Sequence, residues 1–129
     1  MSAWEVLAIA LAGGLGAAAR FTADAAVRSR AGDSFPWGTA VVNVSGSMII
    51  GLATGAALFH DWLGGENGAA LAMIAVGFCG GFTTFSTAMA ESVRLVQSGA
   101  ALAALLNAFG TVVTCTAAAA AGVGVMYLV

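Results

Sequence analysis

The chain has 129 residues, of which 60% are hydrophobic and 8% charged, and its formal net charge is −2 with four arginines and no lysine. A soluble domain carries about 25% charged residues, so this composition excludes a soluble protein and indicates an integral membrane protein. So few cations also exclude a nucleic-acid-binding surface. At about 20 residues per span, the length predicts an all-α membrane protein with four transmembrane helices in one transmembrane domain.

The first predicted span covers about residues 4–22. It lacks the basic start of a secretory signal peptide, and further apolar segments follow it. We therefore expect it to be retained as the first membrane helix and not cleaved off. Glycines at 13, 14 and 16 give it a thin face, which suits close packing against another membrane helix. Residues 24–33, which include Arg28 and Arg30, are expected to form a loop.

The second predicted span covers about residues 36–59. Pro36 is suited to its first turn, where a missing N–H costs nothing. Asn43 is the only carboxamide in this span, and a buried amide must find a partner or a polar cavity. Two interpretations stay open, a pore-lining group that shares its helix face with Thr39 or a hydrogen bond between helices. A polar loop is expected over residues 60–67.

The third predicted span covers about residues 68–97, with a break near its middle at 80–84. Its segment Gly77–Thr87 reads Gly-Phe-Cys-Gly-Gly-Phe-Thr-Thr-Phe-Ser-Thr. Irregular polar backbone at membrane depth is tolerated only where protein buries it or water reaches it. The break therefore predicts an ion or substrate path. Phe85, placed among hydroxyl residues, can present the positive edge of its ring to an anion.

The fourth predicted span covers about residues 100–127. Asn107, Thr111 and Thr114 are spaced at i, i+4 and i+7 and form one polar stripe. Threonine hydroxyls can bond to their own helix, but Asn107 cannot do so comfortably, so we expect the stripe to face a polar path. Because no carboxylate lies deep in a span, such a path suits a small, strongly hydrated ion that needs hydrogen-bond partners.

Four motifs carry a resemblance to a known family. They are Gly13-Gly14-x-Gly16 with Arg20, Pro36-x-Gly38-Thr39-x-x-x-Asn43-x-x-Gly46, Gly77–Thr87 with Glu91, and Ala104-Leu-Leu-Asn107-x-Phe109. With them, the chain resembles the small fluoride channel family, also called CrcB proteins, over nearly its whole length. The string in the third span is the most specific of the four.

The resemblance implies a non-enzymatic fluoride channel in the bacterial inner membrane. It implies an antiparallel, dual-topology homodimer with two fluoride pores at its interface. Fluoride enters cells as its neutral weak acid, is trapped by ionisation, and leaves through the channel by passive electrodiffusion, which reduces its toxicity. The arginines do not match dual topology well, because Arg28, Arg30 and Arg94 all favour cytoplasmic first and third loops under the positive-inside rule.

Residue roles follow from the resemblance by position. The expected fluoride pore comprises amide, hydroxyl and aromatic side chains, namely Thr39, Asn43, Phe85, Ser86, Thr87 and the stripe residue Asn107. Backbone carbonyls of Gly80 and Thr83 are expected to hold a structural sodium ion between the subunits. The chain has Ala88 where the family usually has a second phenylalanine, and Phe82 and Phe109 are the candidates to replace that ring.

Two other classes of protein compete with the channel. A small multidrug exporter also has four helices, but as a proton-coupled carrier it needs a membrane-embedded glutamate in its first span, and Glu5 lies too near the end of that span. A non-conducting membrane subunit would use the polar residues only as contacts between helices. The broken third span disfavours that second alternative.

Overall fold

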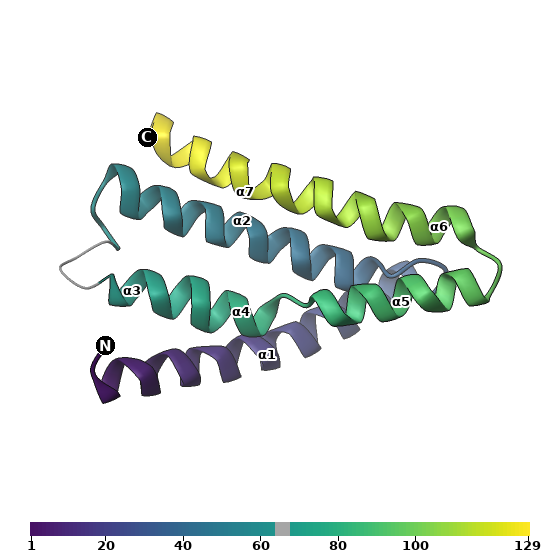
Figure 1. Ribbon diagram of the computed structural model, residues 1–129, viewed down its shortest axis with the longest axis horizontal. Helices are drawn as coiled ribbons and strands as arrows, with labels where there is room; N and C mark the ends of the chain where they lie inside the picture. The colour runs from purple at the N-terminus through teal and green to yellow at the C-terminus, as the bar shows by residue number, and fades with distance from the viewer. Residues whose placement is uncertain (64–67) are drawn as a thin grey trace.

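The computed structural model describes residues 1–63 and 68–129, and the described chain is helical (Figure 1). The expected loop over residues 60–67 lies partly outside this description. The elements in chain order are α1 (Ala3–Ala31), α2 (Trp37–Phe59), α3 (Ala69–Ala72), η1 (Met73–Phe78), α4 (Cys79–Phe82), α5 (Phe85–Gln97), α6 (Ala101–Leu105), η2 (Leu106–Gly110) and α7 (Thr111–Leu128).

Four helical segments of the described chain are long and apolar enough to cross a membrane. They are Ala3–Ala31, Trp37–Phe59, Ala69–Gln97 and Ala101–Leu128. The prediction of an all-helical, four-span membrane protein is confirmed. The two chain ends lie at one end of the bundle, and the α1–α2 and α5–α6 connections lie at the other (Figure 1).

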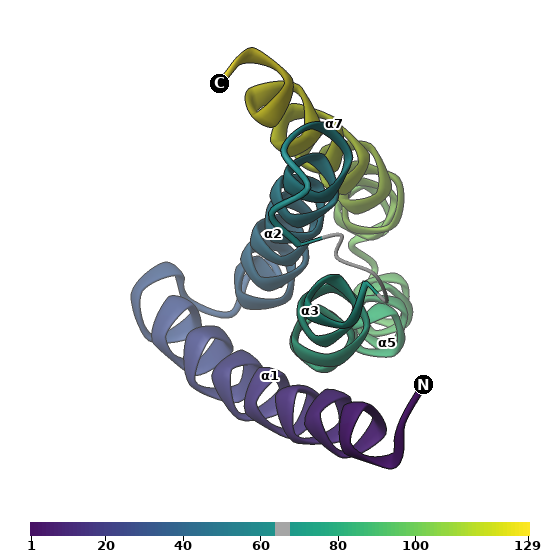
Figure 2. The same cartoon turned by 90° about the vertical axis from the view of Figure 1, so that its left-hand side faces the viewer.

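Small residues allow the spans to approach one another closely. Helix α2 packs along α7, and α1 runs obliquely across η1 and α4 (Figure 2). A Cβ atom at Gly16 would collide with the Phe78 carbonyl, and one at Gly51 would collide with the Ala119 carbonyl. Bilayer lipid provides little hydrophobic drive for association of helices, so such backbone contact is what holds the spans together.

Helix α1 is longer than expected, because it continues through residues 24–33 as far as Ala31. The expected loop over that segment is therefore wrong. The cause is local, since Arg28 Nη2 donates to Asp24 Oδ2 at 3.3 Å across one helical turn, a spacing that supports helices. The helix ends at Gly32, whose φ of 76° glycine adopts without strain.

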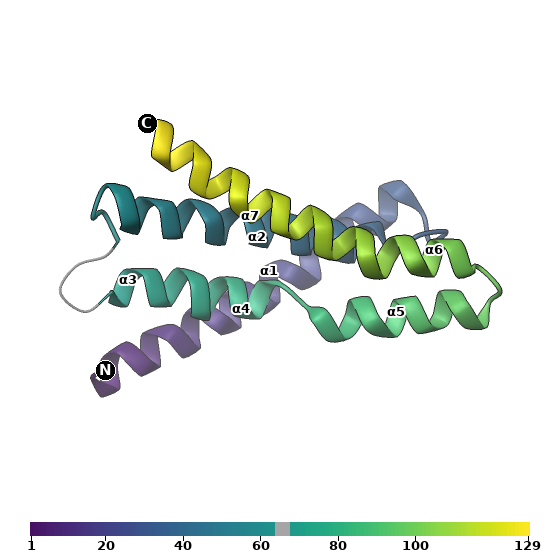
Figure 3. The ribbon, with the colours of Figure 1, turned by 45° about the horizontal axis from the view of Figure 1, so that its top comes forward.

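Helical structure in the third span is interrupted at Thr83 and Thr84, which are both extended and link α4 to α5 (Figure 3). This interruption is shorter than the expected break, because Gly80 and Gly81 belong to α4. Gly81 serves close packing instead, since a Cβ atom there would collide with the Gly13 carbonyl of α1. Gly81 therefore permits close approach of α1, and the two threonines end the helix.

Candidate functional site

The side chain of Asn43 binds the interruption in the third span. Its Nδ2 donates to the Thr84 carbonyl at 2.9 Å, and its Oδ1 accepts from the Thr84 N–H at 2.7 Å. Asn43 is buried, and these two bonds satisfy both backbone groups of a residue that has left the helical ladder. The pair Asn43–Thr84 is called the clamp below.

Thr84 also begins helix α5. Its Oγ1 accepts from the Thr87 N–H at 3.3 Å and donates to Thr87 Oγ1 at 2.9 Å. The first of these bonds is an N-cap, which satisfies one of the free N–H groups at a helix start. The hydroxyl-rich sequence therefore provides the cap that allows a helix to restart within a membrane span.

Two cavities of about 230 Å³ each border Thr84. The first, called the Thr39 cavity, has as its polar lining Arg20, Asp24, Thr39, Thr84 and Thr87. The second, called the Ser47 cavity, has as its polar lining Asn43, Ser47, Thr83, Thr84 and Thr111, with Phe85 at its wall. Amide and hydroxyl groups from the second, third and fourth spans are thus gathered around the clamp, and the first span adds Arg20 and Asp24.

The predicted pore residues of the third span do not all lie together. Phe85 is exposed at the Ser47 cavity and Thr87 lies at the Thr39 cavity, whereas neither cavity includes Ser86 in its lining. Phe82 is buried and stacks on Phe78 with ring centroids 5.5 Å apart. Phe82 is therefore a packing residue in this chain, and Phe85 is the ring that borders a cavity.

Asn107 lies in the wide turn η2 and binds a different part of the third span. Its Nδ2 donates to the Ala88 carbonyl and to Ser92 Oγ, at 2.9 Å each. The stripe of the fourth span is divided, because Thr111 lines the Ser47 cavity while the exposed Thr114 donates to the carbonyls of Gly110 and Thr111 in its own helix. Ala88, which stands where the family usually has a second phenylalanine, is buried, and its carbonyl is bonded to Asn107.

Backbone carbonyls at the interruption lose their helical donors. The Thr84 N–H, which would bond to the Gly80 carbonyl in a continuous helix, goes to Asn43 instead. The Thr87 N–H, which would bond to the Thr83 carbonyl, goes to Thr84 Oγ1. Oxygen atoms of this kind are the ligands that hard cations prefer, and Gly80 is exposed on the surface of the described chain.

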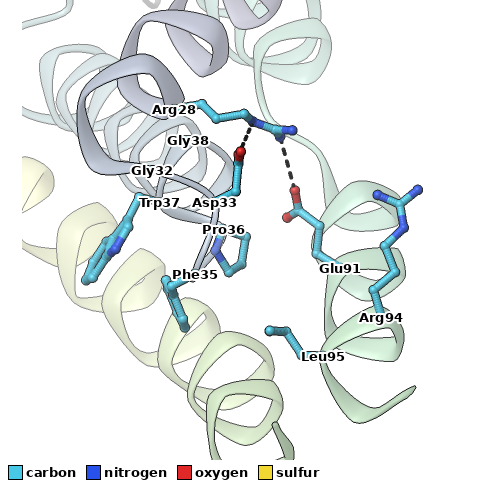
Figure 4. Close-up of a pocket in the computed structure, with 10 residues that line it drawn as sticks. All are labelled: Arg28, Gly32, Asp33, Phe35, Pro36, Trp37, Gly38, Glu91, Arg94 and Leu95. Atoms are coloured by element: carbon cyan, nitrogen blue, oxygen red, sulfur yellow. Dashed lines mark ion pairs between the residues drawn. The ribbon is translucent and has the colours of Figure 1, made fainter. Parts of the chain in front are cut away.

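A third cavity, of about 340 Å³, lies at the end of the bundle where α1 meets α2 and is called the Arg28 cavity. Figure 4 shows Arg28 of α1 between Asp33, which follows α1, and Glu91 of α5. Arg94 lies beside Glu91. The Arg28 guanidinium lies 3.6 Å from the Glu91 carboxylate and 3.9 Å from that of Asp33. Sequence reasoning missed this cluster, although the spacing of Asp24 and Arg28 on one helix indicates it.

The family to which such a chain belongs is decided by comparison with known proteins. Residues 7–123 match the family described as CrcB-like protein, Camphor Resistance (CrcB). The chain belongs to the CrcB family. Among its CrcB relatives, "Fluoride-specific ion channel FluC 1" of Leifsonia xyli is 47% identical over 126 residues, which cover 95% of this chain and 86% of that protein.

Other CrcB relatives are also named as fluoride-specific ion channels. "Fluoride-specific ion channel FluC" of Geobacter sulfurreducens is 41% identical and covers 92% of this chain and 93% of its own. The protein of that name from Thermus thermophilus is 43% identical and covers 81% of each chain. With four apolar spans, this CrcB chain is a multi-pass bacterial membrane protein.

Proposed function

We propose that this chain is a fluoride-selective ion channel that lets cytoplasmic fluoride leave the cell by passive electrodiffusion. One observation carries the proposal: two polar cavities meet at the interrupted third span, where Asn43 and Thr84 hold each other. Fluoride is small and strongly hydrated, so its path must replace water with N–H and O–H donors. The names of the relatives, fluoride-specific ion channels, support the same function.

Asn43, Thr39, Phe85 and Thr87 are the residues to which we assign the pore. The Nδ2 group of Asn43 has two hydrogens, and the bond to the Thr84 carbonyl uses one of them. The second hydrogen is a donor for an anion at the Ser47 cavity, where Phe85 adds the positive edge of its ring. Ser86 and Asn107 belong to the same proposed pore only if a second subunit completes its wall.

A proton-coupled exporter fits the charges less well than a channel. Such a carrier needs an embedded acid that is free to exchange a proton for its cargo. Glu91 is the buried acid of the described spans, but its carboxylate is held 3.6 Å from the Arg28 guanidinium. The Ser47 cavity is lined by neutral residues alone within the described ranges, so it holds no acid that could exchange a proton for cargo.

We propose further that the third span is a functionally broken helix and that the protein works as an antiparallel homodimer of dual topology. Phe85 and Phe109 are exposed in the single chain, and a second subunit gives them a protein environment. Arginine bias can be overridden by the fold when so few charges are present. A terminal tag should therefore be accessible from both sides of intact cells, and access from one side with full channel activity contradicts dual topology.

A structural sodium ion at the dimer axis would give the carbonyls of Gly80 and Thr83 a binding partner. Both have lost the helical donors that they would have in a continuous span. A carbonyl without a partner in hydrocarbon costs several kcal/mol, of the order of 2–7, and a cation shared between two subunits relieves that cost. Neutral carbonyls suit a monovalent ion better than a divalent one. The sodium ion is therefore proposed as a part of the assembly and not as a part of the fluoride path.

Fluoride efflux from liposomes that contain the purified protein tests the proposed function. We expect rapid, voltage-driven efflux of fluoride that does not depend on a proton gradient. A flux that appears only with a proton gradient would instead indicate a coupled exporter. Absence of flux from a folded, correctly inserted protein would indicate a non-conducting subunit.

A further inference from the structure

We propose that Arg28 is the charge-compensating residue of the anion path, because it is ion-paired with two carboxylates between the Arg28 cavity and the Thr39 cavity and offsets one of their two negative charges. The inference rests on the proposed fluoride function and adds to it a residue that governs anion entry. Within the described residues, Arg28 is the arginine that forms ion pairs within 4.0 Å, and all three of those pairs are its own.

The two carboxylates are brought together from different spans. Arg28 Nη2 lies 3.3 Å from Asp24 Oδ2 of its own helix and 3.6 Å from Glu91 Oε1 of α5. One positive charge is therefore shared between these two acids and the exposed Asp33. The second oxygens, Asp24 Oδ1 and Glu91 Oε2, are buried and have no hydrogen-bond partner in the described structure. Arg94 and Arg20 also lie near these acids, but Arg28 is the arginine in direct ion-pair contact with both.

Each of the two acids lines one of the two cavities and lies next to a residue that lines the other. The Asp24 carboxylate is in contact with Gly38, which lines the Arg28 cavity, and Asp24 itself lines the Thr39 cavity. Glu91 lines the Arg28 cavity and lies beside the Thr39 hydroxyl, and Thr39 lines the Thr39 cavity. An anion that moves between the two cavities must therefore pass close to both carboxylates.

Electrostatics then determines whether an anion can pass. Two uncompensated carboxylates within a few ångströms of a low-dielectric path would repel fluoride strongly. Arg28 offsets one of those two negative charges, and because its side chain is half exposed, with 50% of its surface accessible, its remaining N–H groups can meet an anion that arrives from water. The residue therefore favours anion entry without being part of the clamp.

The test compares fluoride efflux from liposomes for four variants. We expect Arg28→Gln to lower flux by about tenfold or more and Arg28→Lys to retain most of it. Arg30→Gln is the matched control, because it removes a positive charge from the same helical turn, where Arg30 bonds to the Ala26 carbonyl of its own helix. Arg28→Gln combined with Glu91→Gln should recover flux to within about threefold of the wild-type rate.

Salt dependence separates a charge effect from a purely structural one. Raising an impermeant salt from about 0.02 to about 0.5 M should speed flux through a folded Arg28→Gln dimer, because screening weakens the repulsion. If Arg28→Gln does not fold, Asp24→Asn provides the test, since removing one acid beside Arg28 should speed flux at low salt. An Arg28→Gln flux equal to the wild-type rate, or an Asp24→Asn flux no faster than it, overturns the inference.

Failure of the inference can be told apart from failure of the proposed function. A wild-type protein that conducts fluoride, together with an Arg28→Gln variant that is equally fast, overturns the role of Arg28 alone. A folded wild-type protein that conducts no fluoride overturns both. A slow Arg28→Gln variant that neither Glu91→Gln nor added salt restores makes Arg28 a structural tether and contradicts its electrostatic role.

Discussion

Fluoride flux should be lost in the Asn43→Asp variant while its dimer still assembles. An aspartate can accept from the Thr84 N–H, as Asn43 Oδ1 does at 2.7 Å, but it cannot donate to the Thr84 carbonyl, to which Nδ2 now bonds at 2.9 Å. It also places a negative charge beside the Ser47 cavity. A lost hydrogen bond and a buried charge together are worth about 3 kcal/mol or more, which corresponds to a loss of about a hundredfold or more in flux.

Efflux from liposomes measures this change, and gel filtration of the purified variant reports whether the dimer forms. Ser45→Ala is a suitable control on the same helix, because the Ser45 hydroxyl donates to carbonyls of its own helix at 2.7 and 3.1 Å. It should conduct at close to the wild-type rate. Wild-type flux through a folded Asn43→Asp dimer would remove Asn43 from the pore.

Replacement of sodium by a bulky organic cation during purification and reconstitution should lower flux and dimer stability together. The carbonyls of Gly80 and Thr83 would then face one another across the dimer without a cation. Each unpartnered carbonyl costs several kcal/mol, on the order of 2–7, so the loss of several such contacts should lower the melting temperature of the dimer. Only the return of sodium should restore that temperature.

Thermal unfolding of the dimer in detergent measures the stability effect independently of flux. Potassium and lithium are informative comparisons, because they have the same charge and a different ionic radius. Unchanged stability and unchanged flux in the rigorous absence of sodium would rule out the structural ion. The assignment of Asn43 and Phe85 to the pore does not depend on that result.

The four spans were predictable because bilayer thickness and hydrophobic length determine them directly. The hydroxyl residues led to the prediction of a break at 80–84, since polar backbone is rare at membrane depth, and the extended residues Thr83 and Thr84 lie within that range. The conformation and the packing role of the two glycines before these threonines were harder to predict. Gly80 and Gly81 suggested a break, yet they are helical, and Gly81 is needed for contact with the Gly13 carbonyl.

Contacts between spans were beyond prediction because sequence spacing does not say which helix faces meet. The sequence left two interpretations of Asn43 open, a pore-lining group or a hydrogen bond between helices. The structure is compatible with both at once, since Asn43 bonds to Thr84 of another span and also borders a polar cavity. Arg28 was assigned to a loop, whereas the continued helix α1 carries it to Glu91. Asn107 was read from its stripe, but its bonds to Ala88 and Ser92 are made across spans.

Passive, selective flux of fluoride through this protein is tested most directly by efflux from liposomes down a fluoride gradient. Liposomes containing the purified protein are loaded with potassium fluoride, diluted into fluoride-free buffer, and made permeable to potassium with valinomycin, with potassium chloride as the matched control. We predict fast release of fluoride at equal pH on both sides and no release of chloride above that of protein-free liposomes. Equal release of both anions, or no release of fluoride, would contradict the account.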